Sequence, residues 1–245
     1  MQSLKRSFDK LRTAVLSNNS LKVREQGMNG TSAKRPRGRP SHSAPSPASD
    51  EACLDVALEA FAARGYDGAS IRDIATASGV SHGLLTARFG SKHGLWLAAV
   101  DHGMGRLHRQ LQIAEQQHLP ETSIEARLRT VCIRFLETVA AYPAIIQLMN
   151  VEGARPGPRL DYIVETFFRS RSWPFATLLA EGQAAGEFRP IHVSVPFTLL
   201  AHGAGALVAL RPLVESVNTS LRTDPEGLTR TIEAAADMIV RGLRP

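Results

Sequence analysis

The sequence contains little cysteine: Cys53 and Cys132 are the only two among 245 residues. Two cysteines cannot build the disulfide framework of a small secreted module, and neither stands in the short Cys or His spacing of a zinc site. Both lie in apolar patterns of helical period, where cysteine is usually a small buried residue. Their scarcity therefore favours a reducing compartment and argues against a disulfide-stabilised or zinc-finger architecture.

Long hydrophobic runs are also missing. The most apolar stretch, Val195–Leu210, is shorter than the roughly 20 residues that a membrane-spanning helix needs, and it contains His202. Near the N-terminus the longest apolar run is Thr13–Leu16, well below the roughly 7–15 residues of a secretory signal. We therefore expect no membrane partner and a cytoplasmic, nucleoid-associated location. Met28 is a second candidate for the first residue of the protein.

Strand patterns and catalytic motifs are absent too. No segment alternates apolar and polar residues over the length of a strand. The sequence has no phosphate-binding loop, dinucleotide fingerprint, nucleophile elbow or HExxH pair. A metal-dependent enzyme would have to use scattered histidines such as His102 and His108, which are six residues apart and do not share one helix face. We therefore expect no enzyme activity, no catalytic residues, no metal and no cofactor.

Basic charge is unevenly distributed along the chain. Residues 1–48 hold ten Lys or Arg against Asp9 and Glu25, a net charge of 10 − 2 = +8. The remaining residues hold 29 − 10 = 19 basic and 23 − 2 = 21 acidic side chains, a net charge of −2. The net charge of +6 thus comes from the N-terminal segment, which predicts a polyanionic partner for that segment alone.

This N-terminal segment shows neither helical nor strand periodicity. Residues 34–49 contain four Pro and several Ser, so we expect residues 1–49 to form a disordered basic arm. Within it, Arg37 and Arg39 flank Gly38 in the sequence PRGRP, which resembles the core of an AT-hook. Two guanidinium groups on a thin backbone fit the narrow minor groove of A·T-rich DNA. The alternative is a basic tail that binds DNA without reading its sequence.

From residue 50 onward nearly every segment places apolar residues at helical spacing, which predicts an all-α fold of about nine helices. Asp50 is the expected N-cap of the first helix and Gly65 its stop. Pro120 and Pro143 are expected to end helices, and Pro174 to bend one. The expected helices cover residues 50–64, 70–78, 81–89, 95–118, 122–142, 144–152, 160–185, 197–211 and 225–243.

The stretch from Ile71 to Gly90 contains two short helices around a glycine. Ser70 and Ser81 are N-cap candidates for these helices, Gly79 suits the left-handed conformation at the turn, and Ser91 can cap a third helix. The residues expected to face inward are Ile71, Ile74, Ala75, Leu85 and Phe89. Such a pair is a helix-turn-helix, whose second helix can enter a major groove. The alternative is an ordinary corner between two helices.

The outer face of the second helix then carries the candidate DNA contacts. Gly83 and Ala87 are small and allow close approach, whereas His82 and Thr86 can hydrogen-bond base edges or phosphates. Free N–H groups at the helix starts suit phosphate oxygens, and Lys92 adds a cation. The expected DNA-binding residues are Arg37, Arg39, Ser70, Ser81, His82, Gly83, Thr86, Ala87, Arg88 and Lys92.

Three motifs follow one another between Phe61 and Leu95: FxxxGY, IAxxSGVSxGLL and FGSKxGL. In this order and spacing, residues 50–97 resemble the N-terminal domain of the TetR/AcrR family of bacterial transcriptional regulators. The resemblance implies a helix-turn-helix domain at residues 50–105 and a helical domain for effector binding and dimerisation at residues 106–245. The family usually has aromatic residues at the positions of Thr86 and Ala87, which pack on the DNA backbone. Without them, other contacts are expected to supply more of the binding.

The resemblance also implies a small-molecule effector, which the middle helices would hold. Aromatic and Met side chains there favour a mostly apolar organic molecule, although such residues at helical spacing also build plain cores. The candidate effector-binding residues are Phe135, Tyr142, Met149, Tyr162, Phe167, Phe168, Trp173 and Phe175.

The last two expected helices are the candidates for a homodimer interface. Residues 197–210 are apolar all round and contain Gly203 and Gly205, which allow close helix approach across a two-fold axis. The alternative is a helix buried inside one protomer. The expected interface residues are Phe197, Leu200, Gly203, Gly205, Leu207, Ile232, Ala236 and Ile239.

Together these features predict a regulator, acting as a repressor, that binds a palindromic operator in double-stranded DNA as a dimer and is released by a small hydrophobic effector. The alternative is an architectural protein that binds A·T-rich DNA broadly through Arg37 and Arg39 and has no effector.

Overall fold

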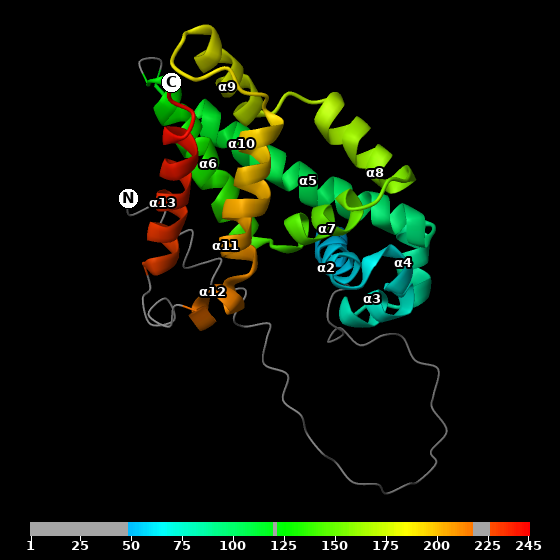
Figure 1. Ribbon diagram of the computed structural model, residues 1–245. Coiled ribbons are helices and arrows are strands. Elements are labelled where there is room, and N and C mark those ends of the chain that lie inside the picture. Colours follow the sequence, from blue (N-terminus) through cyan, green and yellow to red (C-terminus); the bar gives the residue numbers. More distant parts are fainter. Residues whose placement is uncertain (1–48, 120–121, 218–225) are drawn as a thin grey trace, which may run out of the picture. The chain divides into compact units, whose positions relative to one another are not determined.

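The computed structural model describes residues 49–119, 122–217 and 226–245, which belong to one compact unit, Ser46–Pro245. These residues form helices and connecting segments with no strand, so the all-α prediction is confirmed for them (Figure 1). The expected arm up to residue 48, with Arg37 and Arg39, lies outside the described residues, and so do Pro120 and Pro225.

The first four helices are α2 (Asp50–Gly68), α3 (Ile71–Ala77), α4 (His82–Phe89) and α5 (Lys92–Gln116). Ser49, and not Asp50, caps α2, because the Ser49 hydroxyl accepts a hydrogen bond from the Ala52 N–H at 3.2 Å. Gly65 has φ 70° and interrupts α2, as its left-handed preference predicts, and one further turn follows to Gly68. The N-terminal helices therefore agree with the sequence pattern to within a few residues.

The C-terminal part contains more helices than expected, in shorter pieces. They are α6 (Ile124–Ala141), α7 (Ala144–Gly153), α8 (Pro158–Ile163), η1 (Val164–Arg169), α9 (Pro174–Ala184), α10 (Ser194–Thr198), η2 (Leu199–Ala204), α11 (Gly205–Ala209), α12 (Arg211–Val217) and α13 (Gly227–Arg241). The two η segments are π-helical and continue their neighbours directly. When they are merged with those neighbours, the described residues form eleven helices instead of about nine.

The prediction of one helix over residues 160–185, bent at Pro174, is wrong. The first helix ends at Arg169, and Pro174 is the first residue of α9. Trp173 is extended, which the residue before a proline favours, and proline suits the first position of a helix because no N–H is needed there. A hydrogen bond stabilises the segment between the two helices, since the Trp173 indole N–H donates to the Phe167 carbonyl.

The core of the unit is built along α5. This helix packs against α2, α6, α7 and α9, and its inner face carries buried residues such as Trp96, Val100 and Leu111. Cys53 and Cys132 are fully buried in the same core, which confirms their use as small apolar residues. Burial raises the pKa of the Cys132 thiol to about 12, so it stays protonated and unreactive.

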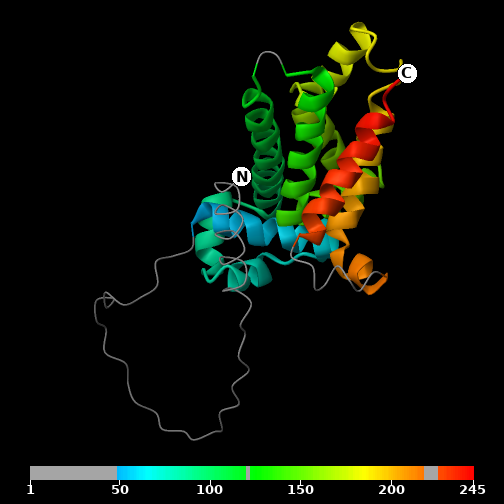
Figure 2. The ribbon, with the colours of Figure 1, turned by 90° about the vertical axis from the view of Figure 1, so that its left-hand side faces the viewer.

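The elements have distinct positions along the unit. α3 and α4 lie at one end, whereas α9 lies at the opposite end (Figure 1). The run α10–α11 lies beside α13 in both views (Figures 1 and 2), and contacts join α13 to η2 and α11. Among the described residues no single helix is long and apolar enough to cross a membrane, and α6 and α7 reach that size only as a pair bent by 93°.

Candidate nucleic-acid interface

α3 and α4 form two short helices around a left-handed glycine, as the sequence predicts. Ser70 caps α3 by accepting from the Asp73 N–H at 3.4 Å, and Ser81 caps α4 by accepting from the Leu84 N–H at 3.1 Å. Gly79 lies in the turn at φ 69°. Buried Ile74, Ala75 and Leu85 hold both helices on the core, with Ile71 and Phe89 partly buried beside them. The helix-turn-helix geometry follows from these caps and buried contacts.

A second turn fixes α4 against α5. Gly90 has φ 75°, and Ser91 caps α5 by accepting from the Gly94 N–H at 3.0 Å. A Cβ atom on Gly94 would lie 2.2 Å from the Phe89 carbonyl oxygen, so only glycine permits this close approach. Gly94, the second glycine of the FGSKxGL motif, thus allows Phe89, the last residue of α4, to lie close against α5.

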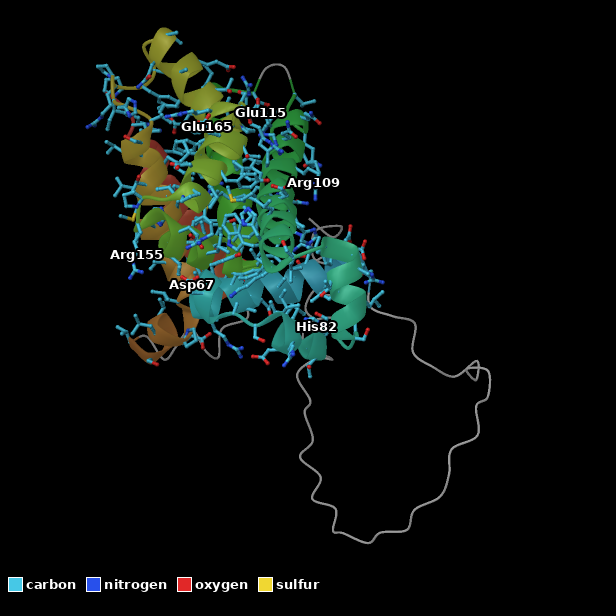
Figure 3. All side chains as sticks on the ribbon, turned by 90° about the vertical axis from the view of Figure 1, so that its right-hand side faces the viewer. Asp67, His82, Arg109, Glu115, Arg155 and Glu165 are labelled. Atoms are coloured by element: carbon cyan, nitrogen blue, oxygen red, sulfur yellow. The ribbon has the colours of Figure 1, made fainter. Side chains whose placement is uncertain are left out.

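The outward face of α4 is small and carries little charge. His82, Gly83 and Ala87 are exposed as expected, and His82 lies at the tip of the unit (Figure 3). Thr86 is partly buried, and its hydroxyl oxygen has no solvent contact and no hydrogen-bond partner among the described residues. The expectation that the Thr86 hydroxyl faces outward is wrong in this structure, because this side of α4 turns toward the core.

Two of the expected cations have partners within the protein. The Arg88 guanidinium lies 3.2 Å from the Asp50 carboxylate and 3.7 Å from the Cys53 sulfur, and its side chain is 23% exposed. Lys92 donates to the Asp67 carbonyl at 3.1 Å, and its ammonium lies 4.9 Å from the centre of the Tyr66 ring. Both residues therefore fasten the helix-turn-helix to α2, and their charge is only partly available to DNA.

One exposed cation was not expected from the sequence. Arg72 lies in the first turn of α3, next to the Ser70 cap, and pairs with no carboxylate among the described residues. Its position across the helix from Ile74, whose side chain faces inward, is the signal that could have identified it. Asp73, on the same turn, pairs with Arg64 of α2 at 3.1 Å. The Arg72 side chain is therefore more accessible to an external anion than the Arg88 side chain.

The N-terminus of α4 adds backbone donors to this surface. Ser81, which is exposed, satisfies the Leu84 N–H, and the preceding N–H groups of the first turn have no acceptor within the helix. Such groups, together with the helix dipole, attract phosphate oxygens. We define the reading face as Arg72, Ser81, His82, Gly83 and Ala87; it combines backbone donors, one cation and small side chains.

Comparison with known proteins identifies this domain. Residues 54–99 match the family model of the bacterial regulatory proteins of the tetR family. This part of the chain is therefore a DNA-binding domain of the tetR type. The regulator RutR of Escherichia coli strain K12 is 24% identical over 198 residues, which cover 81% of this chain and 92% of RutR. The transcriptional repressor Rv3405c of Mycobacterium tuberculosis is 36% identical over 86 residues, 35% of this chain and 46% of the repressor.

A solved structure shares the fold over most of the chain. The ketosteroid transcriptional regulator KstR2 of Mycobacterium tuberculosis superposes with a TM-score of 0.59 at 20% identity, covering 79% of this chain and 93% of KstR2. This similarity of fold continues beyond the helix-turn-helix into the helices that follow α5.

The candidate effector-binding residues separate into two groups. Phe135, Phe168 and Phe175 all contact Phe197, with ring centres 6.0 to 6.1 Å apart, and Trp173 stacks on Phe168. Phe167 is buried, and its carbonyl accepts a hydrogen bond from the Trp173 indole N–H. His108 of α5, which sequence reasoning missed, closes this cluster: its ring lies 5.1 Å from Trp173, and its Nε2 contacts the Ser172 carbonyl at 2.9 Å. The sequence signal for it was a histidine among the apolar residues on the inner face of α5.

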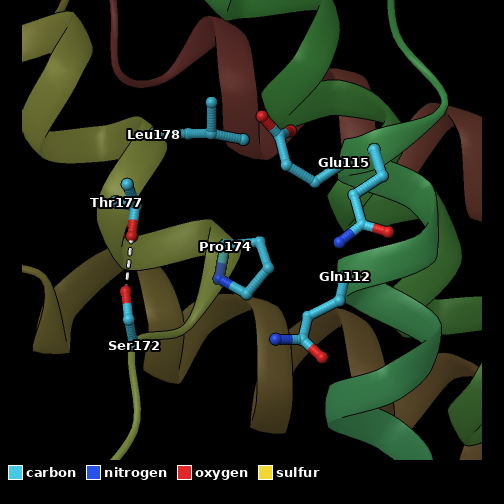
Figure 4. Close-up of a pocket in the computed structure, with 7 residues that line it drawn as sticks. Gln112, Glu115, Ser172, Pro174, Thr177 and Leu178 are labelled. Atoms are coloured by element: carbon cyan, nitrogen blue, oxygen red, sulfur yellow. Dashed lines mark hydrogen bonds between the residues drawn. The ribbon is translucent and has the colours of Figure 1, made fainter.

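The remaining candidates lie elsewhere. The Tyr142 ring stacks under Arg106, and Met149 is partly buried against the core. Tyr162 donates to Asp101 at 2.6 Å, and burial, followed by this hydrogen bond, raises the pKa of Tyr162 to about 12, so that it stays a donor. None of these residues lines the hollow of about 240 Å³ between α5 and α9 (Figure 4). That hollow is lined by Gln112, Glu115, Gln116, Ser172, Pro174, Thr177 and Leu178.

The candidate dimer residues include both buried and exposed side chains. Leu200, Gly205, Ile232 and Ala236 are buried inside the protomer, so they cannot themselves form a contact surface. Phe197 belongs to the aromatic cluster, and Ile239 is partly buried. Gly203 and Leu207 are exposed. The structure thus has helices where they were expected, but several residues predicted for the interface face the core of their own protomer. The sequence could not show this, because a helix that is apolar all round has no polar side to mark its exposed face.

We expect Gly94→Ala to disturb DNA binding and stability together. The added methyl group has to displace the Phe89 backbone, and overpacking of this kind costs roughly 1–3 kcal/mol of the free energy of unfolding. Operator affinity should fall more than affinity for random DNA, since α4 changes its angle. Gly153→Ala is the control, because no atom lies within 4 Å of its Cβ position. Chemical denaturation and fluorescence anisotropy measure both effects; an unchanged operator affinity would contradict the role of Gly94.

Proposed function

We propose that this protein is a transcriptional repressor of the TetR family that binds a palindromic operator as a homodimer and releases it when a small organic effector binds. The observation that carries the proposal is the reading face on α3 and α4, held by three serine caps and two left-handed glycines. The relatives RutR and Rv3405c, named as a transcriptional regulator and a transcriptional repressor, support it. We place this function in the cytoplasm, at the nucleoid.

The proposed mechanism of operator recognition follows from the chemistry of the reading face. His82 can hydrogen-bond a base edge, and the methyl group of Ala87 can contact a thymine methyl in the major groove. Arg72 and the α4 backbone donors position the domain on phosphates. Because Arg88 and Lys92 are engaged with α2, the arm with Arg37 and Arg39 supplies additional affinity in the neighbouring minor groove.

The proposed dimer uses an exposed apolar stripe. It consists of exposed residues on consecutive elements: Val195 of α10, Leu199 of η2, Leu207 of α11, Leu210 at the end of α11, and Leu213 and Val217 of α12. Gly203 lies midway between Leu199 and Leu207 and has no atom within 4 Å of its Cβ position. Met238 of the adjacent α13 is 77% exposed as well. Exposed apolar side chains gathered on one part of a chain mark a contact site, and a two-fold dimer buries them against their own copies.

The proposed effector site is the aromatic cluster around Phe197. Phe168 is 36% exposed, whereas its neighbours Trp173 and Phe175 are buried, so Phe168 is the side chain that an entering molecule can displace. It lies in the π-helical segment η1, next to the break before α9, and π-helical turns are frequent at functional sites. A ligand that replaces Phe168 in the cluster would be mostly apolar, in agreement with the expectation from composition.

The operator experiment tests the DNA-binding proposal and the arm together. The full chain is used to select a binding site from random DNA, and Arg37→Ala with Arg39→Ala is then compared with it. We expect weaker binding, a salt dependence shallower by about one unit for each phosphate that is no longer neutralised, and no preference for A·T flanks. Lys5→Ala with Arg6→Ala removes the same charge outside PRGRP and should keep the flank preference. Broad A·T binding without a selected operator would favour an architectural protein instead.

The dimer experiment uses Gly203→Trp, which places a large ring in the centre of the exposed stripe. We expect a monomer in light scattering and a loss of operator affinity, while the helical content of each protomer is unchanged. Gly153→Trp is the matched control, because Gly153 is also exposed and has no atom within 4 Å of its Cβ position. Gly205 is unsuitable for this test, since it is buried inside the protomer. A dimeric Gly203→Trp protein would place the interface elsewhere.

The effector experiment is a thermal-shift screen with hydrophobic and amphipathic compounds, followed by operator-release assays. A compound releases DNA only if it binds the released state more tightly than the DNA-bound state. Coupling free energies between effector and DNA binding are typically about 1–3 kcal/mol per site. One bound effector is therefore expected to release the operator only in part, and the effects of the two sites in a dimer are expected to add. Phe168→Ala should change the affinity of any compound that acts this way. A compound that stabilises the protein yet leaves operator affinity unchanged would bind without switching.

A further inference from the structure

A compact polar cluster joins α2 to the C-terminal helices. It consists of Asp55 on α2, His102 and Arg106 on α5, and Tyr142 at the end of α6, and we refer to it as the Arg106 cluster. Arg106 donates from Nη1 to Asp55 Oδ1 at 2.7 Å and from Nη2 to Asp55 Oδ2 at 3.1 Å. Its side chain is only 15% exposed. A forked pair with this little solvent contact fixes orientation as well as distance.

The same guanidinium group also contacts the corner between α6 and α7. Its carbon lies 4.0 Å from the centre of the Tyr142 ring, the distance of a cation–π stack. Tyr142 ends α6, and its carbonyl accepts a hydrogen bond from the Ile145 N–H of α7 at 3.2 Å. α6 and α7 meet there at an angle of 93°. A shift of this corner therefore acts directly on the Arg106 side chain.

His102 adds a contact that can take only one of two forms. Its Nε2 lies 2.9 Å from Asp55 Oδ1 and 2.7 Å from Arg106 Nη2. One ring nitrogen cannot donate to the carboxylate and accept from the guanidinium at the same time. The fork between Arg106 and Asp55 is thus the fixed connection in the cluster, and His102 supports either partner.

Close packing around the cluster makes α2 and α5 respond to this connection. A Cβ atom on Gly103 would lie 2.7 Å from Leu58 of α2, so the two helices approach without an intervening side chain. α2 also packs against α7. Ion pairs link it to α3 (Arg64 with Asp73) and to α4 (Arg88 with Asp50), and we refer to α3 and α4 together as the reading domain. The orientation of α2 consequently decides where the recognition helix α4 points.

We propose that Arg106 is a positioning residue that transmits the arrangement of the α6–α7 corner, through Asp55, to the recognition helices. The proposal rests on the proposed function as a dimeric DNA-binding regulator. Because the dimer is held by the C-terminal helices, the separation of its two recognition helices depends on how rigidly α2 is fixed to α5 and α6. Without the fork, each reading domain can pivot and accept half-sites at different separations.

The experiment measures spacing discrimination with the full chain. Operator affinity is compared between the selected operator and the same operator with one base pair inserted between its half-sites. The insertion rotates one half-site by about 34–36° around the helix axis, since a turn contains about 10–10.5 base pairs. The wild-type protein should discriminate strongly between the two. Arg106→Ala and Asp55→Asn should reduce this ratio about tenfold, within the roughly 5- to 150-fold range of typical coupling between sites.

Several variants separate positioning from a merely structural role. Arg244→Ala removes another forked Arg–carboxylate pair, with Glu125 of α6, that does not touch α2, and it should leave the ratio unchanged even if the protein melts earlier. Tyr142→Leu should lower the ratio, whereas Tyr142→Phe should preserve it. Exchanging the charges, Asp55→Arg with Arg106→Asp, should restore part of the discrimination that each single change removes.

The possible failures are distinguishable. If the wild-type chain selects no operator, the proposed function fails. If the wild-type protein discriminates between spacings and the folded Arg106→Ala, Asp55→Asn and Tyr142→Leu variants keep the same ratio, the positioning role of Arg106 is wrong. Should Arg106→Ala not fold, Asp55→Asn and Tyr142→Leu decide the question, because each removes less of the side chain than Arg106→Ala does.

Discussion

The close packing of α2 on α5 is the constraint on which the rest of the structure depends. α5 spans 25 residues, about 37 Å, and supplies one wall of the core for both the reading domain and the C-terminal helices. Gly103 lets α2 lie directly against it, and Asp55 and Arg106 join the two helices across that contact. Residue 105, the expected end of the helix-turn-helix domain, lies inside α5. Any rearrangement of the C-terminal helices therefore reaches the DNA-reading helices through a packed interface.

The reading face is small because most charges near it serve the fold. Arg88 and Lys92 are used to hold α4 and α5 against α2, and Thr86 turns partly inward. What is left is a helix surface with His82, two small residues and backbone donors, with Arg72 on the neighbouring helix. A surface of this kind can approach base pairs closely but contributes few phosphate contacts of its own. The basic N-terminal segment, with a net charge of 10 − 2 = +8 over residues 1–48, compensates for this in the proposed complex.

Residues on opposite sides of the run α10–α11 serve the two proposed roles of the C-terminal helices, effector binding and dimerisation. Phe197 points into the aromatic cluster with Phe168, whereas Leu199 and Leu207 on the same run are exposed. One helical run thus forms part of the proposed effector site on one side and the proposed dimer surface on the other. The π-helical segments η1 and η2 lie within the two runs that meet at Phe168 and Phe197, where a change of helical register would move both sides together.

The sequence by itself determined the all-α class, the helix-turn-helix and its caps. Ser70, Ser81, Ser91, Gly79 and Gly90 act through neighbours within a few residues, so their spacing carries the information. Tertiary structure alone decided which charges pair, as Arg88 with Asp50 and Arg106 with Asp55 show, because these partners are 38 and 51 residues apart. It also decided which side of residues 194–209 faces the core, since an all-round apolar helix has no polar face to mark the outside. The break before Pro174 and the inward turn of Thr86 depend in the same way on packing against distant elements.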